Sequence, residues 1–178
     1  MQRKILIYPS RWYEHKNHHL LIEFAKNSRE FLASHSLQFV TTIAESTSTR
    51  RLLQRAGDSK LGEVFVNIGE VTRVELFRWY AESYAIVFPS ESETFGNGLL
   101  EGACFSLPIL VADRPYGRAF GQENVITFEP RDFSSWRAAI SHLIENYAVY
   151  AERSGRIAKE NAIDSQTWIN RVLDENAI

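Results

Sequence analysis

Short apolar runs alternate with amphipathic stretches along most of the chain. Six runs rich in β-branched and aromatic residues predict strands, because such residues pack well on a pleated surface. These runs are residues 4–8, 37–43, 63–68, 84–88, 108–112 and 124–129. Several of them, such as YAIVF at 84–88, are apolar at every position. That pattern is typical of parallel strands that are covered on both faces.

The stretches between these runs carry apolar residues at helical spacing. Asn17 is predicted to cap the first helix, whose apolar side comprises Leu20, Leu21, Phe24, Phe31 and Leu32. Thr72 and Glu75 have the spacing of a capping box and predict a helix through residue 80. Further helices are predicted at 49–56, 99–105 and 132–147, and two helical segments close the chain, the last containing Trp168.

Strands that alternate with helices predict βαβ units and a parallel sheet. The 178 residues fit one domain of ordinary size. We therefore predict a single doubly wound, Rossmann-like α/β domain over residues 1–178, with about six parallel strands. In such sheets, ligands bind beyond the carboxyl ends of the strands. The loops at 10–16, 43–49, 69–72 and 90–98 are consequently the candidate binding loops.

Composition excludes several classes of protein. The net charge of -2 provides no basic field for nucleic acid. Cys104 is the single cysteine, so an internal disulfide framework and a cysteine metal site are excluded. No run approaches the ~20 apolar residues that span a bilayer, and residues 1–4 lead directly into a strand rather than a signal peptide. We expect a cytoplasmic domain.

The segment FPSESETFGNGLLE at 88–101 has the composition of an anion and polyol site. Two glycines, Gly96 and Gly98, stand at a strand-to-helix turn, where a ligand can approach the backbone closely. The free N–H groups at the start of the following helix favour an anion. Glu93 and Glu101 flank the turn, and carboxylates accept hydrogen bonds from vicinal hydroxyls. Each residue alone is more often structural, but the combination favours a ligand with sugar and phosphate groups.

Arg11 and Lys16 follow the first strand, five residues apart. Arginine presents a planar fork to phosphate and lysine a compact charge. Either cation alone is more often an ordinary surface residue. Because they lie at the same sheet edge as the glycine turn, we predict that they bind phosphate.

Other motifs at these positions fail on spacing. Gly96 and Gly98 begin a dinucleotide fingerprint, but the third glycine, Gly102, comes one residue late, and no GxxxxGK loop occurs. His15, His18 and His19 have no acidic or cysteine partner at metal-site spacing, so we interpret them as solvated or phosphate-adjacent. Cys104 is predicted to pack in the core rather than act as a nucleophile.

These segments together resemble the C-terminal domain of family 4 glycosyltransferases, which are retaining enzymes of the GT-B fold. The family motif E-x-F-G-x-x-x-x-E matches residues 93–101, and its R-x-x-x-x-K motif matches residues 11–16. The flanking segments VFPS at 87–90 and LPIL at 107–110 are also similar to the family. The resemblance covers nearly the whole chain.

The resemblance implies a role for each matched residue. Arg11 and Lys16 would stabilise the departing nucleoside diphosphate, and Glu93 would bind hydroxyls of the donor sugar. The donor would otherwise be held by Phe95, Gly96, Asn97 and Gly98 at the sugar and diphosphate, Glu101 at the ribose, and Ile68 and Val71 at the base. The donor would be a UDP-, GDP- or ADP-linked sugar, and the reaction would need no metal or other cofactor. The absence of an Asp-x-Asp motif agrees with this expectation.

The chain departs from the family pattern at three points. Ser10 replaces the usual glycine, and Asn17, His18 and His19 replace the usual small residues after the lysine. The resemblance is to the C-terminal domain, and we expect the N-terminal acceptor domain of GT-B enzymes to be absent from this sequence. We therefore expect a chain that is inactive alone, that needs an acceptor domain in cis or in trans, and that is peripheral to the inner membrane through that domain. Two alternatives remain open: a non-catalytic nucleotide-binding or assembly module, and a phosphorylase-type enzyme on the same scaffold.

Overall fold

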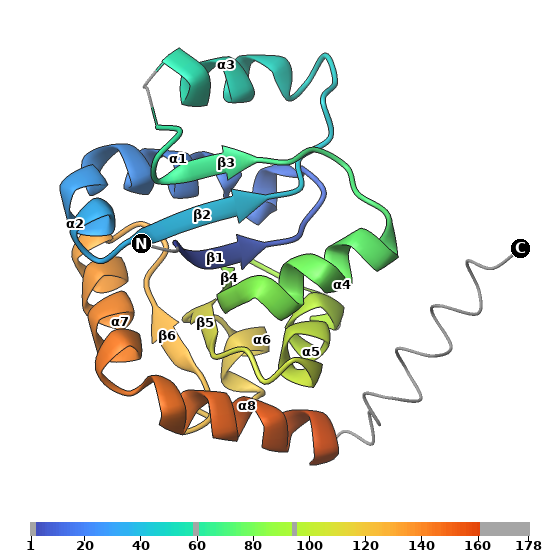
Figure 1. The fold of residues 1–178 in the computed structure, drawn as a ribbon, viewed down its shortest axis with the longest axis vertical. Helices are drawn as coiled ribbons and strands as arrows, with labels where there is room; N and C mark the ends of the chain where they lie inside the picture. The colour runs from blue at the N-terminus through green and yellow to red at the C-terminus, as the bar shows by residue number, and fades with distance from the viewer. Residues whose placement is uncertain (1–2, 59–60, 94–95, 161–178) are drawn as a thin grey trace, which may run out of the picture.

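The computed structural model describes residues 3–58, 61–93 and 96–160. Within these ranges six strands form one entirely parallel sheet: β1 (Lys4–Tyr8), β2 (Leu37–Thr41), β3 (Phe65–Asn67), β4 (Ser83–Phe88), β5 (Ile109–Ala112) and β6 (Ile126–Phe128). Their order is β3-β2-β1-β4-β5-β6, which is the order of Rossmann folds. All six predicted strands and the predicted fold class are confirmed (Figure 1).

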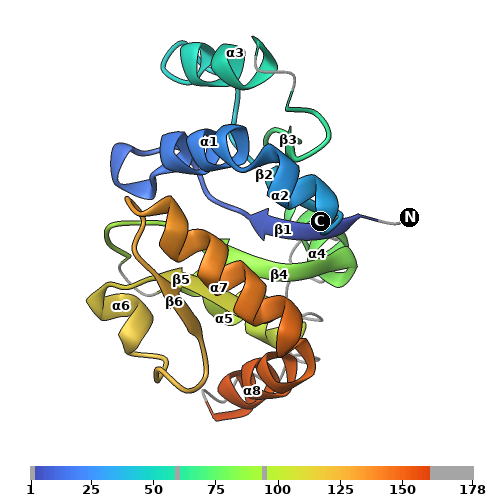
Figure 2. The same cartoon turned by 90° about the vertical axis from the view of Figure 1, so that its left-hand side faces the viewer.

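Helices cover both faces of the sheet, as the apolar strands require. One face carries α1 (His18–Asn27), α2 (Arg29–Ser34) and α7 (Phe133–Glu145) (Figure 2). Phe24 of α1 stacks on Trp136 of α7 with ring centroids 4.9 Å apart, and both rings contact Phe39 of β2. These aromatic contacts join the two halves of the sheet through one continuous core.

The opposite face carries α4 (Arg73–Glu82) and α5 (Asn97–Cys104). Tyr80 of α4 packs on Phe105 at the end of α5, with ring centroids 5.5 Å apart. Helix α8 (Tyr147–Glu160) packs on α5, where the Ser154 hydroxyl donates a hydrogen bond to the Leu107 carbonyl. Helix α3 (Arg50–Asp58) lies beyond the edge strand β3, at the top of Figure 1.

Several local predictions are confirmed and others are wrong. Thr72 and Glu75 form the predicted capping box at the start of α4. Asn17 stands at the start of α1, but its φ of 55° is left-handed and its side chain makes no capping hydrogen bond. The single helix predicted from Asn17 through Leu32 breaks at Ser28 into α1 and α2. The predicted segment around Trp168 lies outside the described residues.

Two short elements have no counterpart among the sequence predictions: a 3-10 turn η1 (Glu14–Lys16) and the helix α6 (Pro115–Arg118). Both follow the carboxyl ends of strands. The helix predicted over 132–147 ends at Glu145 in the structure, and Asn146 separates it from α8. Among the described residues, no helix combines the length and the apolar character that crossing a membrane would require.

The chain reverses its direction of travel across the sheet between β1 and β4, which are hydrogen-bonded neighbours. In doubly wound sheets the crevice at this switch point binds ligands, because the loops that leave the two strands diverge there. The loop after β1 contains Lys16, and the loop after β4 contains Glu93. The topology therefore brings two predicted site residues, 77 positions apart, to one place.

Candidate functional site at the switch point

Lys16 and Glu93 form an ion pair at the switch point. Lys16 Nζ lies 2.5 Å from Glu93 Oε2, and the two side chains are only 16% and 9% exposed. The pair links the loop after β1 with the loop after β4, where the fold places a ligand site. A carboxylate has about four lone-pair positions and an ammonium has three donors. The pair therefore keeps spare hydrogen-bonding capacity for a ligand.

The hydroxyl groups of Ser90 and Tyr8 connect Glu93 to the loop after β1. The Ser90 hydroxyl donates to Glu93 Oε1 at 2.6 Å and also lies 2.8 Å from the Tyr8 hydroxyl. Tyr8 donates in turn to the Lys16 carbonyl at 3.0 Å. Burial raises the pKa of Tyr8 well above its ordinary value, so the phenol stays protonated. Both loops are thus tied to the side chain at the end of β1.

The glycine turn leads into α5 as predicted. Gly96 stands before the first helical residue, Asn97, and has a φ of +61°, a left-handed conformation that favours glycine. A Cβ at Gly98 would lie 2.6 Å from Cζ of the buried Phe88 ring, so this position requires close backbone approach. The free N–H groups of α5 start here, beside the loop of Glu93. Phe95 lies outside the described residues.

Glu101 is held by two side chains of α4. The Tyr80 hydroxyl donates to Glu101 Oε2 at 3.0 Å, and Arg73 donates to Oε1 at 3.2 Å. The Glu101 side chain is 13% exposed. Burial, followed by the charge of Glu101, raises the pKa of Tyr80 well above its ordinary value, so Tyr80 remains a donor. Glu101 is therefore oriented by the helix that precedes β4, whereas Glu93 is oriented by residues of the β1 and β4 loops.

The ion-pair partner of Arg11 is Glu70 rather than a member of the Lys16–Glu93 pair. Its guanidinium is largely exposed and pairs loosely, at 3.8 Å, with Glu70 in the loop after β3. With Trp12 and Tyr13 it lines a cavity of about 210 Å³, whose other walls are Thr42, Ala44, Ser46, Ser48, Thr49 and Glu70. Ile68 and Val71 flank Glu70 in the same loop and are half-buried. The loops after β1, β2 and β3 thus meet at this cavity.

The three histidines do not share one environment. His15 and His19 are exposed, but His18 is buried, so the interpretation of all three as solvated or phosphate-adjacent is wrong for His18. Its ring packs against that of Tyr8 in a tilted arrangement, with centroids 4.8 Å apart, and neither ring nitrogen has a hydrogen-bond partner among the described residues. Across the described ranges, no group of three or more potential ligands is arranged to hold a metal ion. Metal-free chemistry remains a prediction.

Cys104 is half-buried and packs against the core, as predicted. Burial, with a smaller effect from Glu101, raises the pKa of its thiol to about 11. The thiol is therefore protonated near neutral pH, which does not suit a nucleophile.

Sequence reasoning missed the residues that orient the site. Ser90, Tyr8 and Tyr80 each donate a hydrogen bond within it. Ser90 belongs to the predicted loop 90–98 but was given no role there, and the spacing of Tyr8 and Tyr80 matches no motif. A signal existed for Ser90 alone, since it follows a buried strand at the predicted binding edge. Tyr8 and Tyr80 lie on a strand and a helix, where an aromatic residue usually indicates core packing.

Together, the strand order β3-β2-β1-β4-β5-β6 and the helices on both faces of the sheet define the doubly wound, Rossmann-like class of α/β domain. The family of glycosyl transferases group 1 matches residues 3–146. This match covers most of the chain, and the chain belongs to that family.

Curated relatives and solved structures agree with the family. The O-antigen chain mannosyltransferase RfbU of Salmonella typhimurium is 29% identical over 129 residues, covering 72% of this chain and 35% of the relative. The serotype-specific mannosyltransferase WbdA of Escherichia coli is 32% identical over 102 residues, covering 57% of this chain and 12% of that protein. The chain thus spans about a third or less of these relatives.

The fold is shared with a solved enzyme structure. The crystal structure of the pneumococcal O-GlcNAc transferase GtfA in complex with UDP and GlcNAc aligns with a TM-score of 0.72 at 21% identity, over 97% of this chain and 36% of that chain. At this identity the likeness concerns the fold. With the family match, it identifies the chain as a C-terminal domain of the GT-B glycosyltransferase type.

Proposed function

We propose that this chain is the donor-binding domain of a retaining glycosyltransferase. In this proposal it binds a nucleoside-diphosphate sugar and acts with an acceptor domain, in cis or in trans, to transfer the sugar to a glycan, lipid or polysaccharide acceptor. The Lys16–Glu93 ion pair at the switch point between β1 and β4 is the observation that carries the proposal. It combines a cation for phosphate and a carboxylate for hydroxyls at the place where Rossmann sheets bind ligands.

Each part of the donor would meet groups of matching chemistry. Lys16 and the N–H groups at the start of α5 would face the diphosphate, and Arg11 would add a second cation from its exposed position. Glu93 would accept hydrogen bonds from sugar hydroxyls, and Glu101 from the ribose. Ile68 and Val71 would frame the base. The mannosyltransferase relatives make a mannosyl donor the first sugar to test.

Catalysis would rest on charge stabilisation. The leaving nucleoside diphosphate develops negative charge as the sugar departs, and preorganised cations and amides stabilise such charge most in a partly dry site. Lys16 is held in advance by Glu93, and Glu93 by Ser90, so little rearrangement is needed. No residue is assigned to a metal in this scheme.

The test is titration calorimetry of the folded chain with UDP, GDP and ADP. We expect heat of binding for one of them, and a lower affinity for Glu101→Ala, because the ribose would lose its carboxylate partner. Glu145→Ala is the matched control, since Glu145 is exposed at the end of α7, on the other face of the sheet. A folded sample that binds none of the three nucleotides would contradict the proposal.

A further inference from the structure

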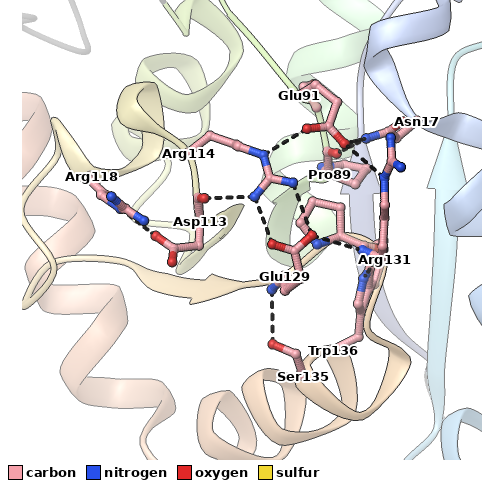
Figure 3. Close-up of polar contacts among 12 residues, drawn as sticks. Asn17, Pro89, Glu91, Asp113, Arg114, Arg118, Glu129, Arg131, Ser135 and Trp136 are labelled. Atoms are coloured by element: carbon pink, nitrogen blue, oxygen red, sulfur yellow. Dashed lines mark hydrogen bonds and ion pairs between the residues drawn. The ribbon is translucent and has the colours of Figure 1, made fainter.

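Arg114 stands at the centre of a polar network at the carboxyl edge of the sheet (Figure 3). It follows β5, the strand beside β4. Its Nη1 and Nη2 atoms bind both carboxylate oxygens of Glu129, at 2.9 and 3.0 Å, as a bidentate fork. Its Nε atom donates to Glu91 Oε2 at 2.8 Å, and Nη1 also donates to the Asp113 carbonyl at 2.9 Å. One guanidinium thus joins the loops that leave β4, β5 and β6.

Glu91 extends this network toward the loop after β1. Its Oε1 atom accepts a hydrogen bond from Asn17 Nδ2 at 3.3 Å, and the same amide donates to the Pro89 carbonyl at 2.8 Å. The Glu91 backbone N–H donates to the His15 carbonyl at 2.8 Å. Two residues of the first loop, His15 and Asn17, are therefore bound to Glu91, and Lys16 lies between them.

Asn17 has a left-handed φ of 55°, a conformation that asparagine adopts more readily than most residues with a side chain. Its amide donates to Pro89 and Glu91 rather than capping α1. The contact with Glu91 thus holds the backbone that immediately follows Lys16. Glu91 is also only two residues from Glu93, so it connects the loops that carry the two members of the ion pair.

We propose that Arg114 is a positioning residue for the donor site: through Glu91 and Asn17 it fixes the two loops that present Lys16 and Glu93, without contacting the donor itself. This inference rests on the proposed function. The Arg114 side chain is 21% exposed, so its charged hydrogen bonds are partly shielded from water. The hydrogen bonds from Arg114 hold the pKa values of Glu91 and Glu129 below their ordinary range, so both carboxylates remain charged partners at neutral pH.

The fork geometry makes a specific demand on residue 114. A lysine ammonium is a single charge and cannot bind both oxygens of Glu129 while also reaching Glu91. Arg114→Lys should therefore fail to restore the site, although it keeps the charge. Arg118→Gln is a matched control, because Arg118 also pairs with a carboxylate, that of Asp113, on the side of Arg114 that faces away from Glu91 (Figure 3).

The experiment compares wild type, Arg114→Gln, Arg114→Lys and Arg118→Gln, all well below their melting temperatures. Nucleotide affinity is measured by calorimetry, and the environment of the ion pair by the side-chain ¹³C and ¹⁵N NMR signals of Glu93 and Lys16. We expect roughly tenfold weaker binding for both Arg114 variants and shifted Glu93 and Lys16 signals, with Arg118→Gln close to wild type.

The outcomes separate the positioning role of Arg114 from the proposed function. Unchanged Glu93 and Lys16 signals in folded Arg114→Gln would overturn the positioning role, whether or not nucleotide binds. Full rescue by Arg114→Lys would overturn the bidentate fork as the basis of this role, because charge alone would then suffice. If the wild-type chain binds no nucleotide but the Arg114 variants shift both signals, the proposed function fails and the positioning role stands.

Discussion

The Tyr80 hydroxyl donates a 3.0 Å hydrogen bond to Glu101 Oε2, joining α4 to α5 on one face of the sheet. Tyr80 is fully buried, and the Glu101 side chain is 13% exposed. A charged acceptor strengthens such a bond, and a buried donor without a partner is costly. The carboxylate predicted to hold the ribose is therefore set in place by a residue that would touch no ligand.

Replacing Tyr80 with phenylalanine tests this relationship. The ring and its packing on Phe105 are kept, so the loss is confined to the hydrogen bond. We expect unfolding free energy to fall by about 2 kcal/mol, as for a hydrogen bond to a charged group. We also expect several-fold weaker nucleotide binding, because Arg73 would be the remaining partner of Glu101 within the described part of the chain. Urea unfolding and calorimetry measure the two effects, and unchanged values in both would refute the assignment.

Gly98 should tolerate no side chain. In Gly98→Ala the new Cβ would meet the buried Phe88 ring at 2.6 Å, and the ring cannot move freely in the core. Overpacking of this kind costs about 1–3 kcal/mol, which thermal unfolding detects. Gly57→Ala in α3 is the control, because the new methyl group would have no neighbour within 4 Å beyond its own helix backbone, and alanine favours helix. Gly57→Ala should be neutral or stabilising, and equal losses in both variants would argue against a specific clash.

His18 should make stability depend on pH. Burial lowers the pKa of its imidazole from 6.5 to about 4 in the folded protein. The unfolded chain therefore binds a proton below about pH 6.5 that the native state does not bind. The free energy of unfolding is therefore unaffected by His18 above that pH and decreases as the pH falls toward 4. At pH 5 the loss is about 2 kcal/mol relative to pH 7.

The variant His18→Leu isolates that effect. Both ring nitrogens of His18 are buried without partners, so an apolar side chain of similar size should be neutral or stabilising at pH 7. Urea unfolding at pH 7 and pH 5 gives the comparison with wild type. We expect the wild type to lose about 2 kcal/mol more than the variant between these two values. Parallel losses would show that His18 is not the titrating group.

The Lys16–Glu93 pair should behave as a coupled unit. Among the described residues, Lys16→Met would leave the nearly buried Glu93 carboxylate with Ser90 as its remaining donor, at a cost of about 3 kcal/mol. Lys16→Met combined with Glu93→Gln removes both charges and should recover much of that loss. A double-mutant cycle by urea unfolding measures the coupling. Strictly additive effects would mean that the pair is not formed in solution.

Local pattern was enough to predict the six strands of the described ranges and the capping box at Thr72, because these features depend on neighbouring residues. The break at Ser28 was not predictable, since the apolar spacing continues through it. The predicted capping hydrogen bond of Asn17 was wrong because the prediction considered only neighbouring residues. Its residue type suits a helix cap, but Pro89 and Glu91, more than 70 positions away, compete for its amide.

The doubly wound parallel sheet and the family motifs at 11–16 and 93–101 follow from the amino-acid sequence alone, since periodicity and motif spacing are properties of the chain. Which of these residues meet became visible only in the folded molecule. The fold pairs Lys16 with Glu93 and turns Arg11 to Glu70. It also joins Glu101 to Tyr80 and buries His18. The physical reason is that strand order brings distant loops together, and distance, burial and charge then determine which side chains bind one another.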